Sequence, residues 1–223
     1  MADAAKKKSS VKGAKHTLCR RVGYCLWGKA NCPTNSRTIK DKNGNDIQSK
    51  ERAYPAGQHG PTKRRGKLST YGELLLEKQK LRAYYDISER QLHFLYVEAK
   101  KGNSVTGTKL MQFLETRLMT AVYRSGLAPT IFAARQAVSH GHILVNGKKV
   151  NRPSYRLKPG QVISIDEQHS PVIAEIAKGN DALVPAFYER EKGSCKATYL
   201  HEPTAEEIQN NIDVTKVIEY YAR

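Results

Sequence analysis

The chain is poor in several kinds of residue, and each shortage excludes a class of protein. Its 223 residues include only four cysteines, too few for a small scaffold built on disulfides. No apolar run approaches the roughly 20 residues that span a bilayer. The N-terminus, MADAAKKKSS, has no apolar stretch behind its basic start, so it does not predict a secretory signal. We therefore expect a cytoplasmic protein with a buried core of its own.

Acidic residues are also scarce, and in one stretch they are absent. Lys and Arg number 38 against 21 Asp and Glu, which gives a net charge of +17. Between Gln136 and Ile165 there are basic residues and not one Asp or Glu. A structured surface without acids is suited to phosphates. Nucleic acid is therefore the favoured partner, and an anionic membrane is the alternative.

The positive charge is spread unevenly along the chain. Residues 1–70 carry a net +13 and residues 113–165 a net +7, whereas residues 71–112 carry +2 and residues 166–223 carry −5. We predict that the first and third of these segments form the electropositive surface. Residues 1–15 consist mainly of Lys, Ala and Ser, which is typical of a basic tail.

Helical signals begin at Thr70, after a long segment rich in turn residues. Thr70 with Glu73, and Ser88 with Gln91, match the capping box that opens a helix. A third helix is predicted from about 108 to 124, with an apolar stripe formed by Met111, Leu114, Leu118 and Val122. A fourth is predicted to run from Thr130 to a glycine stop at position 141.

The hydrophobic period then changes to that of strands. Ile143 to Val145 leads into Asn146-Gly147, the favoured pair for a type I′ hairpin. Further strands are predicted at 162–165 and within 183–200. Residues 208–222 predict a short helix followed by the strand VTKVIEYYA.

Polar and basic residues gather where the fourth helix meets the first of these strands. Arg suits phosphate because its planar fork donates two hydrogen bonds, while Lys acts as a mobile point charge. Structured RNA is bound through shape, phosphates and 2′-hydroxyls, which favours a rigid polar ledge of this kind. The candidate RNA-binding residues of this module are Arg117, Arg135, Gln136, His140, His142, Asn146, Lys148, Lys149 and Arg152.

A second candidate site lies in the N-terminal third. The loop Pro55 to Gly60, PAGQHG, contains glycines that allow a close backbone approach, and a basic run follows it. The candidate RNA-binding residues here are Arg20, Arg21, Gln58, His59, Lys63, Arg64, Arg65 and Lys67.

Motifs of catalysis are missing from the chain. It contains no G-x-S-x-G, no P-loop, no G-x-G-x-x-G and no H-E-x-x-H. An RNA-modifying enzyme that carries the module as an accessory would need a catalytic domain. Residues 16–112 lack the strands for one and residues 166–223 lack the length, so we predict that the protein is not an enzyme.

Four possible metal ligands lie near the N-terminus. His16, Cys19, Cys25 and Cys32 fall within 17 residues, and four N and S ligands can close a tetrahedral zinc site. Only the first pair is closely spaced, and gaps of five and six residues are not those of a zinc knuckle. We therefore favour free thiols over a metal. His140 and His142 lack nearby Cys or carboxylate partners, so they favour RNA contact or helix capping.

Several of these motifs, in one order, resemble a known family. LCRR from Leu18, PAGQHGPTKRRGKLSTYG from Pro55, EKQKLR from Glu77 and RQAVSHGHILVNGKKVNRPSYRLKPG from Arg135 are together similar to bacterial small-subunit ribosomal protein four. The resemblance covers about residues 15–165. The last of these motifs alone is shared with pseudouridine synthases, tyrosyl-tRNA synthetases and small heat-shock RNA-binding proteins.

The resemblance implies a structural constituent of the small ribosomal subunit. Such proteins are primary binders of small-subunit ribosomal RNA that nucleate the subunit body. They lie beside small-subunit ribosomal protein five near the mRNA entrance and influence translational accuracy. Some members hold zinc or an iron–sulfur cluster through four cysteines, but His16 stands where the first cysteine would be. We therefore expect no metal and no cofactor, in a ribosome-bound protein of the cytoplasm.

The predicted fold class is α+β. It comprises a mainly helical domain, an inserted module in which two antiparallel helices pack on a small antiparallel sheet, and an irregular basic N-terminal extension. The predicted division is residues 1–69 for the extension, 70–112 with 166–223 for the helical body, and 113–165 for the RNA-binding module.

Overall fold

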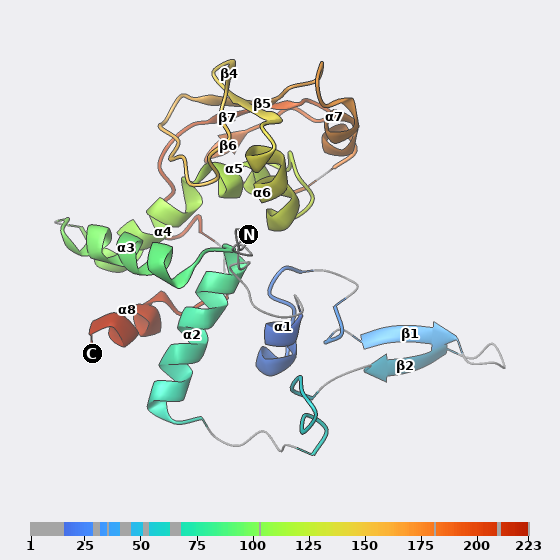
Figure 1. Cartoon of the computed structure of the whole chain (residues 1–223), viewed down its shortest axis with the longest axis vertical. Helices are drawn as coiled ribbons and strands as arrows, with labels where there is room; N and C mark the ends of the chain where they lie inside the picture. Colours follow the sequence, from blue (N-terminus) through green and yellow to red (C-terminus); the bar gives the residue numbers. More distant parts are fainter. Residues whose placement is uncertain are drawn as a thin grey trace, which may run out of the picture. The chain divides into compact units, whose positions relative to one another are not determined.

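The structure is a computed structural model of the whole chain (Figure 1). Its described residues form two compact units, the first drawn from residues 1–89 with 212–223 and the second from residues 90–211. Lys63, Arg64, Arg65 and Lys67 of the predicted RNA-binding set lie outside the described part of the chain. The described residues are 16–28, 32–34, 36–40, 46–50, 54–62, 68–102, 104–180, 182–208 and 211–222.

The N-terminal part of the first unit contains regular elements that the sequence did not predict. Helix α1, Thr17–Val22, ends at Gly23, whose left-handed φ of 97° closes the last turn. Strands β1, Ser36–Lys40, and β2, Asp46–Lys50, form an antiparallel hairpin (Figure 1). These short elements were not predicted, because segments of five or six residues carry too little hydrophobic periodicity to indicate a hairpin or a short helix.

Two helices distant in sequence pack together in the same unit. Helix α2, Thr70–Tyr84, is capped by Ser69, whose hydroxyl accepts from the Gly72 N–H at 3.2 Å. The cap therefore lies one residue before the predicted Thr70. Helix α8, Val214–Ala222, occupies the segment that was predicted to be a strand. That prediction was wrong, because packing on α2 outweighs the strand preference of the β-branched and aromatic residues.

Among the described residues, five helices belong wholly or mainly to the second unit. They are α3, Glu89–Lys100; α4, Thr106–Glu115; α5, Leu118–Arg124; α6, Ile131–Ser139; and α7, Pro171–Lys178. The predicted helix start at Thr130 is confirmed, since the Thr130 hydroxyl caps α6 by accepting from the Ala133 N–H at 3.1 Å.

An antiparallel five-stranded sheet completes this unit, in the order β4-β3-β5-β7-β6. The hairpin of β3, Ile143–Val145, and β4, Lys148–Lys149, closes through Asn146-Gly147. Both turn residues have positive φ, 49° and 76°, which confirms the predicted type I′ geometry. The remaining strands are β5, Val162–Ile165; β6, Tyr188–Glu189; and β7, Lys196–Tyr199.

The core of the second unit lies between this sheet and its helices. Helices α5 and α6 lie on one side of the sheet (Figure 1). Leu118 and Val138 from the helices, with Ile143 and Ile163 from the strands, are fully buried in one cluster that includes Tyr199 of β7. The sheet of the predicted module thus continues into strands from the acidic C-terminal segment.

The helix predicted over about 108–124 is two helices. It breaks at Thr116–Arg117, where Arg117 adopts an extended backbone with ψ of 136°. A segment from later in the chain takes up the backbone groups, since the Leu118 N–H donates to the Tyr155 carbonyl at 2.7 Å and the Leu157 N–H to that of Thr116 at 2.9 Å. The single-helix prediction was wrong because a periodic stripe does not show long-range hydrogen bonds.

The predicted fold class, α+β with two helices packed on an antiparallel sheet, is confirmed. The compact units follow other boundaries than the predicted three-part division, because α7, β6 and β7 share the core of residues 118–165. That division therefore stays a prediction about functional parts.

Candidate nucleic-acid interface and metal cluster

The end of α6 and the start of β3 form a corner of polar and basic side chains. Gly141 turns the chain there with a φ of 76°, and Lys149 crosses so close to it that a Cβ on Gly141 would collide with the lysine side chain. The rings of His140 and His142 lie 5.9 Å apart. His142 Nδ1 lies 2.5 Å from the Oγ of Ser170, the residue that precedes α7, so this histidine is held in position. His140 is exposed.

Asn146 is committed to the hairpin rather than to a ligand. Its Oδ1 accepts from the Val162 N–H at 2.8 Å, and its own N–H donates to the Val162 carbonyl at 2.9 Å. Beyond it, Lys148 and Lys149 are exposed on the outermost strand of the sheet. Asn146 therefore shapes the turn that presents the two lysines.

The predicted site residues differ widely in exposure. Arg20, Arg135 and His142 are half-buried, and Arg117 is buried with only 5% of its surface exposed. The exposed members are Arg21, Gln58, His59, Gln136, His140, Asn146, Lys148, Lys149 and Arg152. The second unit thus holds the predicted residues of α6, of the α6–β3 corner and of the β3–β4 hairpin, whereas the residues before position 69 belong to the first unit.

The loop of residues 54–62 is tightly closed. A Cβ at Gly60 would collide with the Pro55 carbonyl oxygen, so only glycine is accommodated there. Arg20 ties the loop to α1: its Nε donates to the Tyr54 carbonyl and its Nη2 to the Pro55 carbonyl, both at 3.2 Å. Arg20 is therefore an anchor for the loop, whereas Arg21, one residue later on α1, is exposed.

Four potential metal ligands converge beside α1. The ligand atoms of His16, Cys19, Cys25 and Cys32 all lie within 4.8 Å of one another. Zinc–sulfur bonds of about 2.3 Å in a tetrahedron place two sulfurs about 3.8 Å apart, so this donor set is of the right size and chemistry. The expectation of free thiols rested on the spacing in sequence, and the structure removes that reason.

The electrostatics of the cluster are unusual for thiols. Burial, together with the neighbouring Cys32 and Cys25, raises the pKa of Cys19 to about 12. For Cys32 burial acts in the same direction, but hydrogen bonds from Thr34, Cys25 and Cys19 prevail and lower its pKa. Its Sγ lies 3.0 Å from the Thr34 hydroxyl. One buried thiol is thus held neutral while its neighbour is stabilised as a thiolate, as happens when several thiols share a site.

The same residues make the small core of the N-terminal segment. Cys19 and Cys32 are fully buried with Leu26 and with Ala83 of α2, and the half-buried Trp27 packs against them. So few apolar side chains contribute little stability by themselves. An ion bound by the four ligands would cross-link the segment from residue 16 to residue 32.

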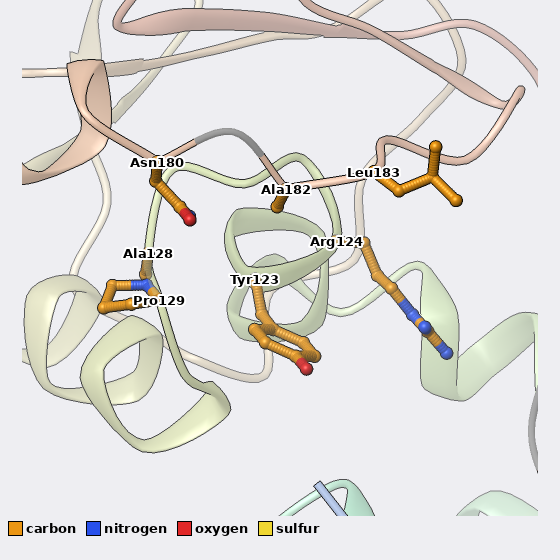
Figure 2. A pocket seen from close by; sticks show the side chains of 7 residues that line it. All are labelled: Tyr123, Arg124, Ala128, Pro129, Asn180, Ala182 and Leu183. Atoms are coloured by element: carbon orange, nitrogen blue, oxygen red, sulfur yellow. The ribbon is translucent and has the colours of Figure 1, made fainter. Parts of the chain in front are cut away.

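A shallow cavity of about 260 Å³ lies elsewhere in the second unit (Figure 2). Arg124 beside it is paired with Glu115 at 2.7 Å, and the Asn180 side chain donates to the Gly126 carbonyl at 2.7 Å. None of the described lining residues is His, Cys, Asp or Glu. They are Tyr123, Arg124, Ala128, Pro129, Asn180, Ala182 and Leu183.

Two contacts that sequence reasoning missed support the candidate interface. Arg156 pairs with Glu98 through both oxygens, at 2.5 and 2.6 Å, and stacks over the Phe113 ring at 4.4 Å. Ser170 positions His142 as described. Arg156 lies within the acid-free stretch, so its charge was visible in the sequence, but its partner on α3 was not.

Among the described residues, none of the helices has the length and apolarity needed to cross a membrane.

Two models of known protein families match this chain. The model described as "Ribosomal protein S4/S9 N-terminal domain" matches residues 10–115, and the "S4 domain" model matches residues 116–163. The second match begins at the α4–α5 break and covers the corner with its hairpin. Together they define a ribosomal protein of the S4 class.

Full-length relatives narrow this class to one family. The chain is 39% identical over 220 residues to small ribosomal subunit protein uS4 of Bartonella bacilliformis, covering 96% of this chain and all of the relative. It is 41% identical over 217 residues to uS4 of Brevibacillus brevis, with the same coverage. The Xanthobacter autotrophicus protein is 39% identical over 215 residues, or 94% of this chain and 97% of its own. The chain belongs to the small ribosomal subunit protein uS4 family, whose members are structural proteins and not enzymes.

Proposed function

We propose that this protein is a structural constituent of the small ribosomal subunit that binds small-subunit ribosomal RNA. Family membership supports the ribosomal role. The observation that carries the RNA-binding role is the corner between α6 and β4, where exposed His140, Lys148 and Lys149 lie in a stretch without any acidic residue. Rigid backbone and phosphate-directed side chains are what structured RNA requires.

The finer role follows from the family resemblance. We infer a primary RNA binder that nucleates assembly of the subunit body and contributes to translational accuracy. It would lie near the mRNA entrance beside small-subunit ribosomal protein five, ribosome-bound in the cytoplasm. The net charge of +17 supports contacts with RNA, and the net −5 of residues 166–223 offers a surface of opposite sign to a basic protein neighbour.

The predicted residues remain the proposed RNA contacts, with roles refined by their surroundings. Arg21, Gln58 and His59 are exposed in the first unit. Arg20 and Asn146 contribute by positioning, because their side chains hold backbone groups of the protein. The division into extension, helical body and module is proposed as a division of function, supported by the S4 domain match to residues 116–163.

Binding to RNA tests this proposal directly. Arg135→Ala and Arg21→Ala are each expected to weaken binding to a transcript of the 5′ domain of small-subunit ribosomal RNA by about 1–3 kcal/mol, with little change in stability. Lys192→Ala is the matched control, since this exposed lysine lies outside the acid-free stretch. Unchanged dissociation constants for both arginine variants would contradict the proposed surface. Failure of the protein to co-sediment with small subunits after a moderate salt wash would contradict the ribosomal role.

A second function, metal binding, is proposed because the four ligands converge within 4.8 Å. Family members with four cysteines hold zinc or an iron–sulfur cluster, and here His16, Cys19, Cys25 and Cys32 would hold the ion. Such an ion supplies structural cross-linking and neutralises thiolate charge. The chain's own residues position it: α1 presents Cys19, and Thr34 supports Cys32.

Metal analysis of the purified full chain decides this second proposal. One equivalent of zinc, or an iron–sulfur cluster with visible absorption, is expected in the native protein and is lost in Cys25→Ser. Cys195→Ser is the matched control, because Cys195 is buried in the other unit beside the Ala174 carbonyl. Four freely titratable thiols, or a disulfide among the three N-terminal cysteines, would overturn the assignment.

A further inference from the structure

Arg117 is a buried cation for which the described chain supplies no partner. It lies at the α4–α5 break with 5% of its surface exposed. Its Nε is fully buried and makes no hydrogen bond. Within the described part of the chain no carboxylate forms an ion pair with it, since the nearby Glu115 is bound by both nitrogens of the Arg124 fork. A guanidinium in this state lacks the compensation that buried charges ordinarily have.

The neighbours of Arg117 increase its positive surroundings. Its backbone forms an isolated antiparallel bridge with Arg156, which brings the two residues side by side across the break. Burial, together with the charges of Arg156 and Arg135, lowers the pKa of Arg117 to about 10. The three arginines therefore share a region of positive potential.

Glu98 pairs with Arg156 and not with Arg117. It holds the Arg156 fork at 2.5 and 2.6 Å, while Phe113 covers the guanidinium at 4.4 Å. Arg156 is thus neutralised and fixed in direction, whereas Arg117 is not. The burial of Arg117 without a carboxylate partner among the described residues is explained if a ligand supplies the negative charge.

We infer that Arg117, which lies beside Arg156 at the α4–α5 break, forms a recessed anion site that takes one phosphate group of the RNA backbone. The inference rests on the proposed RNA-binding function and makes it more specific. Contacts on an open face can be exchanged for hydrated ions, whereas a phosphate bound by a buried fork loses its water and gains charge-assisted hydrogen bonds. One recessed phosphate would set the register of the RNA on the lysine-bearing corner.

The decisive variant is Arg117→Met, which retains apolar bulk and removes the charge. In chloride it is expected to melt at or above the temperature of the native protein, because a desolvated cation has been removed. Its affinity for the 5′-domain transcript is expected to fall about tenfold or more. Lys192→Met, which removes an equal charge from an exposed position, is expected to change affinity less than about threefold.

Inorganic phosphate distinguishes the anion site from general RNA attraction. At equal ionic strength, replacing chloride by phosphate should raise the melting temperature of the native protein and not that of Arg117→Met. If phosphate stabilises both proteins equally, the anion binds elsewhere and the inference is wrong. If phosphate has no effect on either but Arg117→Met still loses RNA affinity selectively, the site requires the phosphate within RNA, which supports the inference.

A purely structural role would give a different pattern. Arg117→Met would then melt well below the native protein while any RNA affinity of its folded fraction stayed unchanged, and the inference would fail. Should Arg117→Met not fold, Arg117→Lys retains the charge without the two-nitrogen fork and is expected to lose part of the affinity. Native protein that does not bind the transcript at all would count against the proposed function itself.

Discussion

At the scale of single residues, the burial of an ion pair decides how much the pair contributes to the free energy of unfolding. Glu115 and Arg124 form a pair with 0% and 16% of their side chains exposed, whereas Glu98 and Arg156 have 36% and 34% exposed. Removing one partner of a buried pair leaves an uncompensated charge, whereas a half-exposed pair loses strength to solvent. The two pairs therefore differ in effect despite their similar geometry.

We predict that Glu115→Gln lowers the free energy of unfolding by about 3 kcal/mol. Glu98→Gln should cost less than about 1 kcal/mol. Urea titrations of the two variants and the native protein, followed by circular dichroism, measure the difference. Equal losses in both variants would contradict the ranking by burial.

The same Glu98 predicts a dependence of stability on pH. Hydrogen bonding to Arg156 lowers its pKa below the ordinary 4.5, so the folded state favours the carboxylate. Its contribution is therefore present above pH 4.5 and is lost as the pH falls through the lowered folded value. Between neutral pH and about pH 3.5 the native protein should lose more stability than Glu98→Gln. Parallel melting curves in the two proteins would show that this pair does not contribute.

At the scale of elements, the periodic stripe predicted burial better than it predicted helix bounds. Met111, Leu114, Leu118 and Val122 are all buried as the stripe predicts, although the helix breaks between the second and third. The helix start predicted at Thr130 is correct, whereas the cap predicted at Thr70 lies one residue earlier, at Ser69. The break and the helical state of α8 depend on partners far along the chain, which local sequence does not report.

The buried stripe gives a prediction for α5. Leu118 is fully buried in the core between the helices and the sheet. Leu118→Ala should therefore cost about 2–5 kcal/mol through the cavity it leaves. Exposed Leu183, at 94%, is the matched position, and Leu183→Ala should change stability by less than about 0.5 kcal/mol. Thermal or urea unfolding measures both, and a small loss at Leu118 would mean that α5 is not packed as described.

At the scale of the whole molecule, charge governs how the protein meets its RNA. A net charge of +17 attracts a polyanion over distance and releases counterions on contact. If about 6–10 phosphates are neutralised, the affinity should fall by about 10³–10⁵-fold between about 50 and 200 mM salt. Lys149→Ala should reduce the slope of log affinity against log salt by about one. A flat salt dependence of the native protein would exclude binding through phosphates.

The sequence by itself determined the class of fold, the buried faces of the helices, the type I′ hairpin and the electropositive stretch. These features arise from composition, short-range periodicity and turn chemistry, which act over a few residues. It also identified most candidate contacts of the module, but it could not separate Arg21, which is exposed, from Arg20, whose fork holds the 54–62 loop.

Only the tertiary structure decided three other features. It gathered His16, Cys19, Cys25 and Cys32 into one cluster despite their irregular spacing. It broke the predicted 108–124 helix at Arg117, and it buried that arginine beside Arg156, with no carboxylate partner among the described residues. The cluster depends on backbone turns between residues 16 and 32. The helix break and the burial of Arg117 depend on hydrogen bonds with a segment about 40 residues later in the chain. Neither kind of contact has a periodic or compositional signature. Their energies become defined only when the segments meet in the fold.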